Sequence, residues 1–214
     1  ALAKKSTVPI GLHLDHCSDV PTLLLAICEG FTSVMADGSA LSFEENAGFV
    51  KSITEVAKIF DVDVEAQLGH VGHSNDGFDG SDKSLYTIPE EASLFAECTE
   101  INSLGIAIGN VHGAYKGKLQ LDFDLLQKIH AATPIPLVLH GGSGLPANQL
   151  EQAMRMGISK LNVSTDYINL YEEAQYTYYK EQYKKGSYCD KYPFLREQLT
   201  NYIAEKLLAC SLTV

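Results

Sequence analysis

The sequence predicts an α/β fold built on a parallel sheet, and three observations support it. Six short apolar segments of strand length alternate with amphipathic segments of helix length along the 214 residues. The strand segments are mostly apolar throughout, as are strands that are covered on both faces. Polar residues capable of chemistry follow the strands, which is where parallel α/β folds place their sites. The predicted strands are Pro9–Leu14, Ser33–Ala36, Asp63–Leu68, Leu104–Ile108, Pro136–Leu139 and Lys160–Val163.

The segments between the strands carry the signals of helix starts. Ser42 and Glu45 match a capping box, which predicts a helix to about Phe60. Thr87–Glu90 matches a second capping box, with a proline suited to the first turn of a helix that ends near Ile101. Repeated strand–helix units of this kind form right-handed crossovers in a parallel sheet. The remaining predicted helices are a segment capped by Asp122 and ending near Ala131, followed by 148–156, 167–184 and 193–209.

The distribution of the candidate functional residues favours a closed barrel over an open sheet. These residues follow six different strands, whereas an open doubly wound sheet would gather them at one switch point. A closed (β/α)8 TIM barrel needs eight strands and usually about 250 residues. We therefore expect a single barrel domain over residues 1–214, with a C-terminal helical region over 165–214 and about two N-terminal βα units missing from this chain. The first and last predicted strands would then be sheet edges.

Composition excludes several classes of function. Hydrophobic residues make up 45% of the chain and charged residues 20%, as in an ordinary globular protein. The longest apolar runs are far below the ~20 residues of a membrane span, and no signal peptide is visible. A net charge of −11 argues against a nucleic-acid partner. The five scattered cysteines lack CxxC spacing, which indicates reduced thiols in a cytoplasmic protein.

Three histidines, His16, His112 and His140, follow three different predicted strands. Three histidine ligands with one open position form a catalytic metal arrangement, and Zn²⁺ suits imidazole. Asp15 shares a strand face with His13, so it could act as an acid or base beside the metal, or could orient a histidine. The spacing is not a local metal motif, so buried, hydrogen-bonded histidines are the alternative interpretation.

Polar and glycine-rich turns precede two of the predicted helices. His140–Gly144 and Asn162–Thr165 each follow a strand, and backbone N–H groups in such turns bind phosphate. The loops after strands 7 and 8 of a barrel often have this role. Lys116 lies in another glycine-containing loop and could bind a second anion. The alternative is that these glycines only allow tight turns.

The segments that contain these residues resemble the motifs of class II, zinc-dependent ketose-bisphosphate aldolases, of the fructose- and tagatose-bisphosphate type. The first two βα units of that family are what this chain lacks. The resemblance implies an enzyme that reversibly cleaves a ketose 1,6-bisphosphate to dihydroxyacetone phosphate and an aldehyde phosphate. It also implies a homodimer or homotetramer that takes small sugar phosphates, with neither a nucleic acid nor a membrane as partner. The similar segments, in the family's order, are Val8–Cys17, Met35–Ser39, Gly109–Lys116, Leu139–Pro146 and Asn162–Thr165.

The resemblance further implies roles for individual residues. His16, His112 and His140 would bind one catalytic Zn²⁺, and the family pattern leaves room for a monovalent cation as a second ion. Asp15 would be the acid or base at the aldehyde-side oxygen. Ser164 stands where fructose-specific members typically have Asp, whereas tagatose-type and related members vary, which argues against fructose specificity. The phosphate and hydroxyls of the ketone half would be held by Gly113, Lys116, Gly141, Ser143, Asn162, Ser164 and Thr165.

Two positions depart from the family pattern. Gln67 and Asn75 stand where glutamates are expected, and an amide cannot accept the proton of the ketone half. Asp76 is adjacent and is our candidate for that catalytic role, although His70 or His73 could serve, or could be only solvated loop residues. The loop over residues 69–85 has no apolar periodicity, which predicts a mobile lid. The alternatives are a family member with a changed substrate or reaction, and a non-catalytic homologue that binds metal or sugar phosphate.

Overall fold

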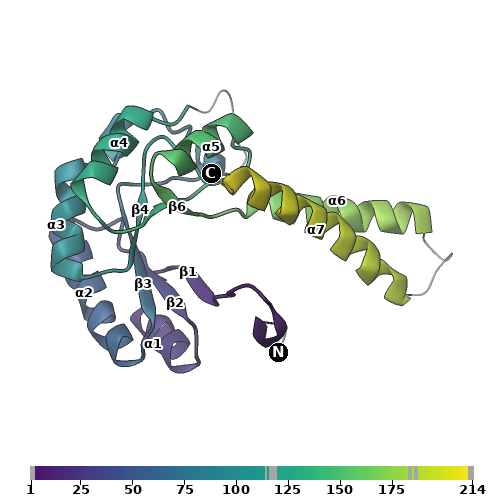
Figure 1. Cartoon of the computed structure of the whole chain (residues 1–214), viewed down its shortest axis with the longest axis horizontal. Helices are drawn as coiled ribbons and strands as arrows, with labels where there is room; N and C mark the ends of the chain where they lie inside the picture. Colours follow the sequence, from purple (N-terminus) through teal and green to yellow (C-terminus); the bar gives the residue numbers. More distant parts are fainter. Residues whose placement is uncertain (1–2, 114, 116–119, 183–184, 186–187, 212–214) are drawn as a thin grey trace. The chain divides into compact units, whose positions relative to one another are not determined.

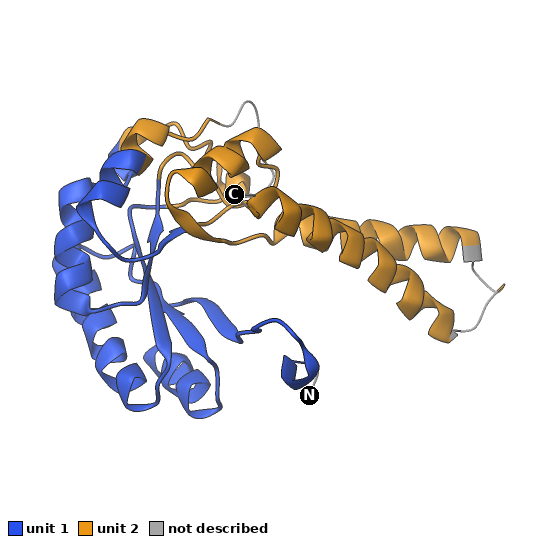
Figure 2. Cartoon of the chain, viewed as in Figure 1, with its two compact units in different colours: residues 1–70, 84–107, 127–138 blue, residues 71–83, 108–126, 139–214 orange. Residues whose placement is uncertain are grey.

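The structure is a computed structural model that describes residues 3–113, 115, 120–182, 185 and 188–211. Its contacts divide the chain into two compact units, coloured separately in Figure 2. Unit 1 comprises residues 1–70, 84–107 and 127–138. Unit 2 comprises residues 71–83, 108–126 and 139–214. Since each unit gathers segments that are distant in the sequence, neither one corresponds to a simple N-terminal or C-terminal half.

Unit 1 is built on a parallel sheet whose strands pair in chain order. Its four complete strands are β1 (His13–Cys17), β2 (Ser33–Ala36), β3 (Asp63–Leu68) and β4 (Ser103–Ile106). The backbone N–H of Leu104 donates to the carbonyl of Pro136 at 3.0 Å, immediately before β5 (Leu137–Leu139). The apolar residues of β2 and β4 are fully buried, as the sequence predicts for strands covered on both faces.

The helices α1 (Val20–Cys28) and α2 (Phe43–Ile59) pack against these strands, and α3 (Pro89–Thr99) packs against α2 (Figure 1). The predicted capping box at the start of α2 is confirmed, because the Ser42 hydroxyl accepts from Glu45 N–H and the Glu45 carboxylate accepts from Ser42 N–H. The second predicted capping box is wrong. The Thr87 hydroxyl donates to the Leu68 carbonyl and accepts from Ala107 N–H, so these two strand ends use it instead.

The first strand lies later in the chain than predicted. Val8, Ile10 and Leu12 are each more than half exposed, so this apolar run does not enter the buried sheet. The strand instead runs from His13 to Cys17 and contains a bulge, because its register with β2 shifts between Leu14 and Cys17. His16, predicted to lie just after the strand, is part of this bulge and has a left-handed backbone with φ of 41°.

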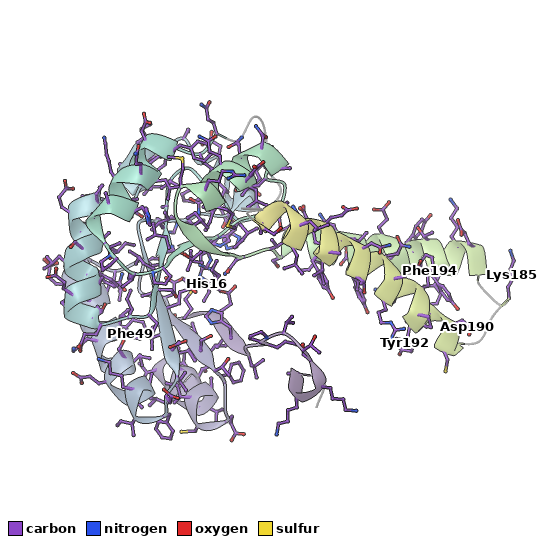
Figure 3. The ribbon with its side chains drawn as sticks, in the orientation of Figure 1. His16, Phe49, Lys185, Asp190, Tyr192 and Phe194 are labelled. Atoms are coloured by element: carbon purple, nitrogen blue, oxygen red, sulfur yellow. The ribbon has the colours of Figure 1, made fainter. Side chains whose placement is uncertain are left out.

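Unit 2 contains the last strand, β6 (Ile158–Leu161), and the helices α5 (Ala147–Arg155), α6 (Thr165–Gln182) and α7 (Lys191–Cys210). Asn162 N–H donates to the carbonyl of Leu139 at 3.0 Å, which ties the end of β6 to the end of β5. The helices α6 and α7 lie side by side with opposite directions and extend away from the rest of this unit (Figures 1 and 2). Phe194, labelled in Figure 3, lies on α7 and packs against Tyr178 of α6, with ring centroids 5.8 Å apart.

The remaining helix, α4 (Phe123–Ala132), begins in unit 2 and ends in unit 1. Its predicted cap is confirmed, since the Asp122 carboxylate accepts from Leu125 N–H at 3.0 Å. Short 3-10 helices occupy Ala3–Lys5, Ser74–Asp76, Lys83–Leu85 and Tyr188–Asp190.

The six strands follow the order β1-β2-β3-β4-β5-β6, with β1 and β6 at the two ends, as the sequence predicts. The alternation of parallel strands and helices is a partial TIM-barrel-like α/β fold. Within the described ranges, no helix is long and apolar enough to cross a membrane. Among the described residues, no cysteine forms a disulfide.

Candidate active site

The bulge of β1 presents His16 to the end of the neighbouring strand. Nδ1 of His16 lies 2.7 Å from Oδ2 of Asp37, which directly follows β2. The other carboxylate oxygen of Asp37 accepts from the backbone N–H of Ser39 at 3.0 Å. A carboxylate can only accept from a ring N–H, so Nδ1 carries the proton and Nε2 keeps the lone pair that a metal ligand requires. Figure 3 labels the His16 side chain.

The hydrogen bond between His16 and Asp37 shifts the pKa values of both side chains. Burial would raise the pKa of Asp37, but the hydrogen bonds from His16 and Ser39 outweigh it and hold that pKa well below its usual range. Burial would lower the pKa of His16, but the bond to Asp37 and the negative charges of Asp15, Asp37 and Glu65 raise it. The carboxylates around His16 therefore create a negative potential at this imidazole, which attracts a cation.

Asp15, His13 and Glu65 form a second cluster of side chains in unit 1 that can act as metal ligands. Oδ1 of Asp15 is 3.8 Å from Nε2 of His13, which is 4.0 Å from Oε2 of Glu65. The side chain of Asp15 is 52% exposed, whereas Glu65 is buried. One ligand atom from each of the three lies within 4.8 Å of the others, so this group could bind a metal ion. As predicted, His13 and Asp15 share one side of β1, and the Asp15 carboxylate is open to solvent.

In unit 2, the structure brings His112 and His140 together. Their ring centroids lie 5.7 Å apart, at an interplanar angle of 87°. Nδ1 of His112 lies 3.2 Å from the carbonyl of Val71, which can only accept, so Nδ1 carries the proton and Nε2 has the lone pair. His140 is fully buried, and Asn110 donates to its backbone carbonyl. An imidazole oriented through Nδ1 by an oxygen acceptor, as that of His112 is, fits a metal ion.

The two turns predicted to bind phosphate lie side by side in unit 2. Gly142 N–H donates to the carbonyl of Asn162 at 2.9 Å, and the amide of Asn162 lies 3.3 Å from Nδ1 of His140. The hydroxyl of Ser143 accepts from the backbone N–H groups of Ser164 and Asp166, at 3.3 and 3.1 Å. Ser143 thus caps the N-terminus of α6, a use of this side chain that the sequence did not predict.

Tyr115 has a structural role that the sequence analysis missed. Its hydroxyl donates to the carbonyl of Gly141 at 2.7 Å and accepts from the N–H of Val111 at 3.0 Å. Burial raises the pKa of this phenol to about 12. Gly141 has φ of +69°, and a Cβ there would collide with the carbonyl of Val111. The only sequence signal was a tyrosine between glycines. Lys116, the predicted anion-binding residue of this loop, lies outside the described residues.

The two positions that depart from the family pattern differ in their surroundings. Gln67 is buried, and its side-chain amide donates to the carbonyl of Gly69 at 3.3 Å. Asn75 and Asp76 are exposed and lie in the short 3-10 helix Ser74–Asp76. Gly113, another predicted phosphate-binding residue, has φ of +95° and packs closely on the Ser74 side chain.

Comparison with known proteins identifies the family. The model of the class II fructose-bisphosphate aldolases matches residues 1–211 of this chain. The chain belongs to the class II fructose-bisphosphate aldolase family. Among solved structures, the YdjI aldolase from Escherichia coli K12 is 31% identical, with a TM-score of 0.82, over 98% of this chain and 72% of that one. Fructose-bisphosphate aldolase (Fba) from Campylobacter jejuni is 28% identical, with a TM-score of 0.77, over 98% of this chain and 73% of that one.

Family membership defines the general chemistry of the chain. A class II aldolase is a carbon–carbon lyase that depends on a metal ion and takes sugar phosphates. The residues present fit a metal, because His16 and His112 are each oriented through Nδ1 by an oxygen acceptor.

Proposed function

We propose that this class II aldolase reversibly cleaves a ketose 1,6-bisphosphate into dihydroxyacetone phosphate and an aldehyde phosphate. The observation that carries the proposal is the orientation of its histidines. His16 and His112 each have Nδ1 committed to an oxygen acceptor, on Asp37 and Val71, which leaves Nε2 for a metal ion. Two histidines without a metal role would have no need to share this orientation, with Nδ1 bonded to oxygen and Nε2 left for a ligand bond.

We propose that His16, His112 and His140 bind one divalent ion, Zn²⁺. Imidazole nitrogen suits zinc, and three histidines leave a fourth position open for substrate. The close approach of His112 and His140 within unit 2 supports the assignment of these two. When bound, the ion supplies a Lewis acid that polarises the ketone carbonyl of the substrate.

Asp15 handles the proton on the aldehyde side of the reaction. In the cleavage direction, its carboxylate accepts the proton of the hydroxyl beside the scissile carbon–carbon bond. The electron pair of that bond passes to the ketone half as the aldehyde leaves. The exposure of the Asp15 carboxylate supports this role, because a general base must reach the hydroxyl that it deprotonates.

The ketone half must gain a proton at the carbon where the bond broke. We propose that Asp76 donates this proton, because the amide of the neighbouring Asn75 has no acidic proton to give. Asp76 is exposed on the loop that the sequence predicts to cover the substrate. Aspartate is one methylene shorter than the glutamate of the family pattern, so the loop must approach the substrate more closely.

The ketone-half phosphate is held by the paired turns of unit 2. The N-terminus of α6 and the glycine-rich turn after β5 are adjacent, since Gly142 N–H donates to the carbonyl of Asn162, and turns of this kind before a helix are typical phosphate sites. We propose that Gly113, Gly141, Asn162 and Thr165 form this anion site. Ser143 contributes by holding the first turn of α6 in place. We further propose that Ser164 and Thr165 contact the substrate and shift its preference away from fructose 1,6-bisphosphate.

The decisive experiment measures turnover of fructose and tagatose 1,6-bisphosphates, with and without a chelator. The proposal expects cleavage of at least one sugar, its loss on chelation and its recovery on addition of Zn²⁺. Activity that survives complete metal removal would contradict the metal-dependent mechanism.

A second candidate function is supported by Gln67 and Asn75, which stand where the family has glutamates. A chain with this pattern could bind metal and sugar phosphate without turnover, or could act on a different substrate. Zinc binding together with dihydroxyacetone phosphate binding, but no cleavage of either bisphosphate, would favour this candidate.

A further inference from the structure

We propose that His73 is a positioning residue for the metal ligand His112, so that the loop segment 71–74 sets the affinity of the site for its ion. The inference rests on the proposed function, in which His112 binds the metal. It concerns unit 2 alone and a residue that the proposed chemistry does not otherwise use.

The two imidazole rings are stacked. Their centroids lie 4.8 Å apart, with an interplanar angle of 29°. The edge of the His140 ring meets the same His112 ring at 87°, with the centroids 5.7 Å apart. The ring of His112 thus has one aromatic neighbour in a stacked arrangement and another in an edge arrangement, which are the two favourable geometries for aromatic pairs. Rotation of His112 about its side-chain bonds would break both contacts.

The backbone of segment 71–74 is hydrogen-bonded to the backbone of His112. His112 N–H donates to the carbonyl of Gly72, and Ser74 N–H donates to the carbonyl of His112, both at 2.9 Å. These two bonds make a parallel bridge between His73 and His112. Because Nδ1 of His112 also donates to the carbonyl of Val71, both the main chain and the ring of His112 are tied to segment 71–74.

Glycines allow the loop to approach this closely. A Cβ on Gly113 would collide with the Ser74 side chain, and one on Gly80 would collide with the carbonyl of Gly109. A Cβ on Gly72 would collide with the ring of Phe78. The loop after His73 therefore packs along the segment 109–113, which contains the metal ligand.

The consequence is a link between the loop and the metal site. Groups that orient a metal-bound histidine usually change metal affinity by about 10–100-fold when removed. His73 is exposed, so its ring contributes little buried apolar area, and the stack is its most specific interaction among the described residues. The stack also explains why a histidine can be useful at this position without being a base or a ligand.

The test compares zinc affinity of the full chain, freed of metal and titrated against a competing chelator. The variants are His73→Ala, which removes the ring, and His73→Phe, which keeps a stacking ring without nitrogen. We expect about 10-fold weaker zinc binding for His73→Ala and near-native binding for His73→Phe. His130→Ala is the control, because this exposed histidine lies on α4 and outside the segment 71–74, and its zinc affinity should equal that of the native chain.

Two results would overturn the inference. One is native zinc affinity in His73→Ala; the other is equal weakening in both His73 variants, which would make the His73 nitrogen, and not the stack, the active feature. Far-ultraviolet circular dichroism of each variant verifies that it has folded. Failure of the proposed function gives a different result, because His112→Ala would then bind zinc as tightly as the native chain.

Discussion

His16 and Asp37 come from neighbouring strands and are joined through Nδ1 and Oδ2 at 2.7 Å. This bond forms across the bulge in β1, where His16 adopts a left-handed backbone. It sets both the orientation and the proton position of the imidazole, which are the two properties that a metal ligand must have fixed.

Removal of this carboxylate should weaken metal binding. We expect Asp37→Ala to lower zinc affinity by about 10–100-fold, since His16 would lose the acceptor that orients it. The zinc affinity of Asp37→Asn should lie between those of Asp37→Ala and the native chain, because its amide oxygen can still accept from Nδ1. Chelator competition measures both values. Native affinity in Asp37→Ala would show that the pair is not part of the metal site.

Asp15 should behave in the opposite way. We expect Asp15→Ala to keep most of its zinc affinity but to lose about 10²–10⁴-fold in turnover, which is the usual contribution of a general acid or base. The two assays are zinc titration and cleavage of the preferred bisphosphate. An active Asp15→Ala variant would leave Asp15 with only a structural role.

The loop acid is tested by a matched pair of substitutions. Asp76→Asn should lower turnover by at least about 10²-fold, whereas Asp82→Asn on the same loop should have little effect. Substrate affinity should change little in both, because neither carboxylate is proposed to hold a phosphate. If Asp76→Asn is silent while Asn75→Glu raises the rate sharply, the loop is a degraded catalytic element.

Gly141 should tolerate no side chain. Both Gly141 and Gly77 have positive φ, of 69° and 89°, but only at Gly141 would a Cβ collide with a backbone carbonyl, that of Val111. Each alanine substitution should cost about 1–2 kcal/mol in backbone strain. We expect Gly141→Ala to cost at least about 1 kcal/mol more than Gly77→Ala, because a core overlap adds to the strain. Urea unfolding measures the free energies, and equal values for the two variants would contradict the collision.

Stability towards acid should depend on Glu100. The side chains of Lys51 and Lys58 lower the pKa of Glu100 to about 2, from an ordinary value of 4.5. A carboxyl group with a lowered pKa in the folded state stabilises that state above pH 4.5, and this stabilisation is lost as the pH falls towards 2. Glu100→Gln should therefore show a flatter loss of stability over this window. The difference should shrink in high salt, since the ion pairs are exposed.

The sequence predicted best what short-range patterns determine. Ser33–Ala36 and Asp63–Leu68 match the observed strands, because the first is mostly apolar and the second alternates polar with apolar residues. The cap at Ser42 was predictable because both of its partners lie within one helical turn. At Thr87 the same reasoning failed, because a hydroxyl has alternatives, and here two strand ends distant in sequence bind it.

Some features of the candidate site were also predictable from the sequence, and others were not. The identity of the histidines and of Asp15 could be read from their positions after strands and from the family motifs. The hydrogen bond of Tyr115 to Gly141 and the stack of His73 on His112 could not, because each depends on how two loops approach one another. Loop conformation is set by packing and by glycine backbone geometry, for which a single sequence carries little signal.

The extra residue in β1 determines which mutations this strand can tolerate. Loss of one residue between Leu14 and Cys17 would restore regular pairing with β2 and turn His16 to the opposite side of the sheet. Exchange of Leu14 for another apolar residue would leave the spacing intact. The length of this strand is therefore under stronger constraint than its composition, and an insertion or deletion here would be more damaging than most substitutions.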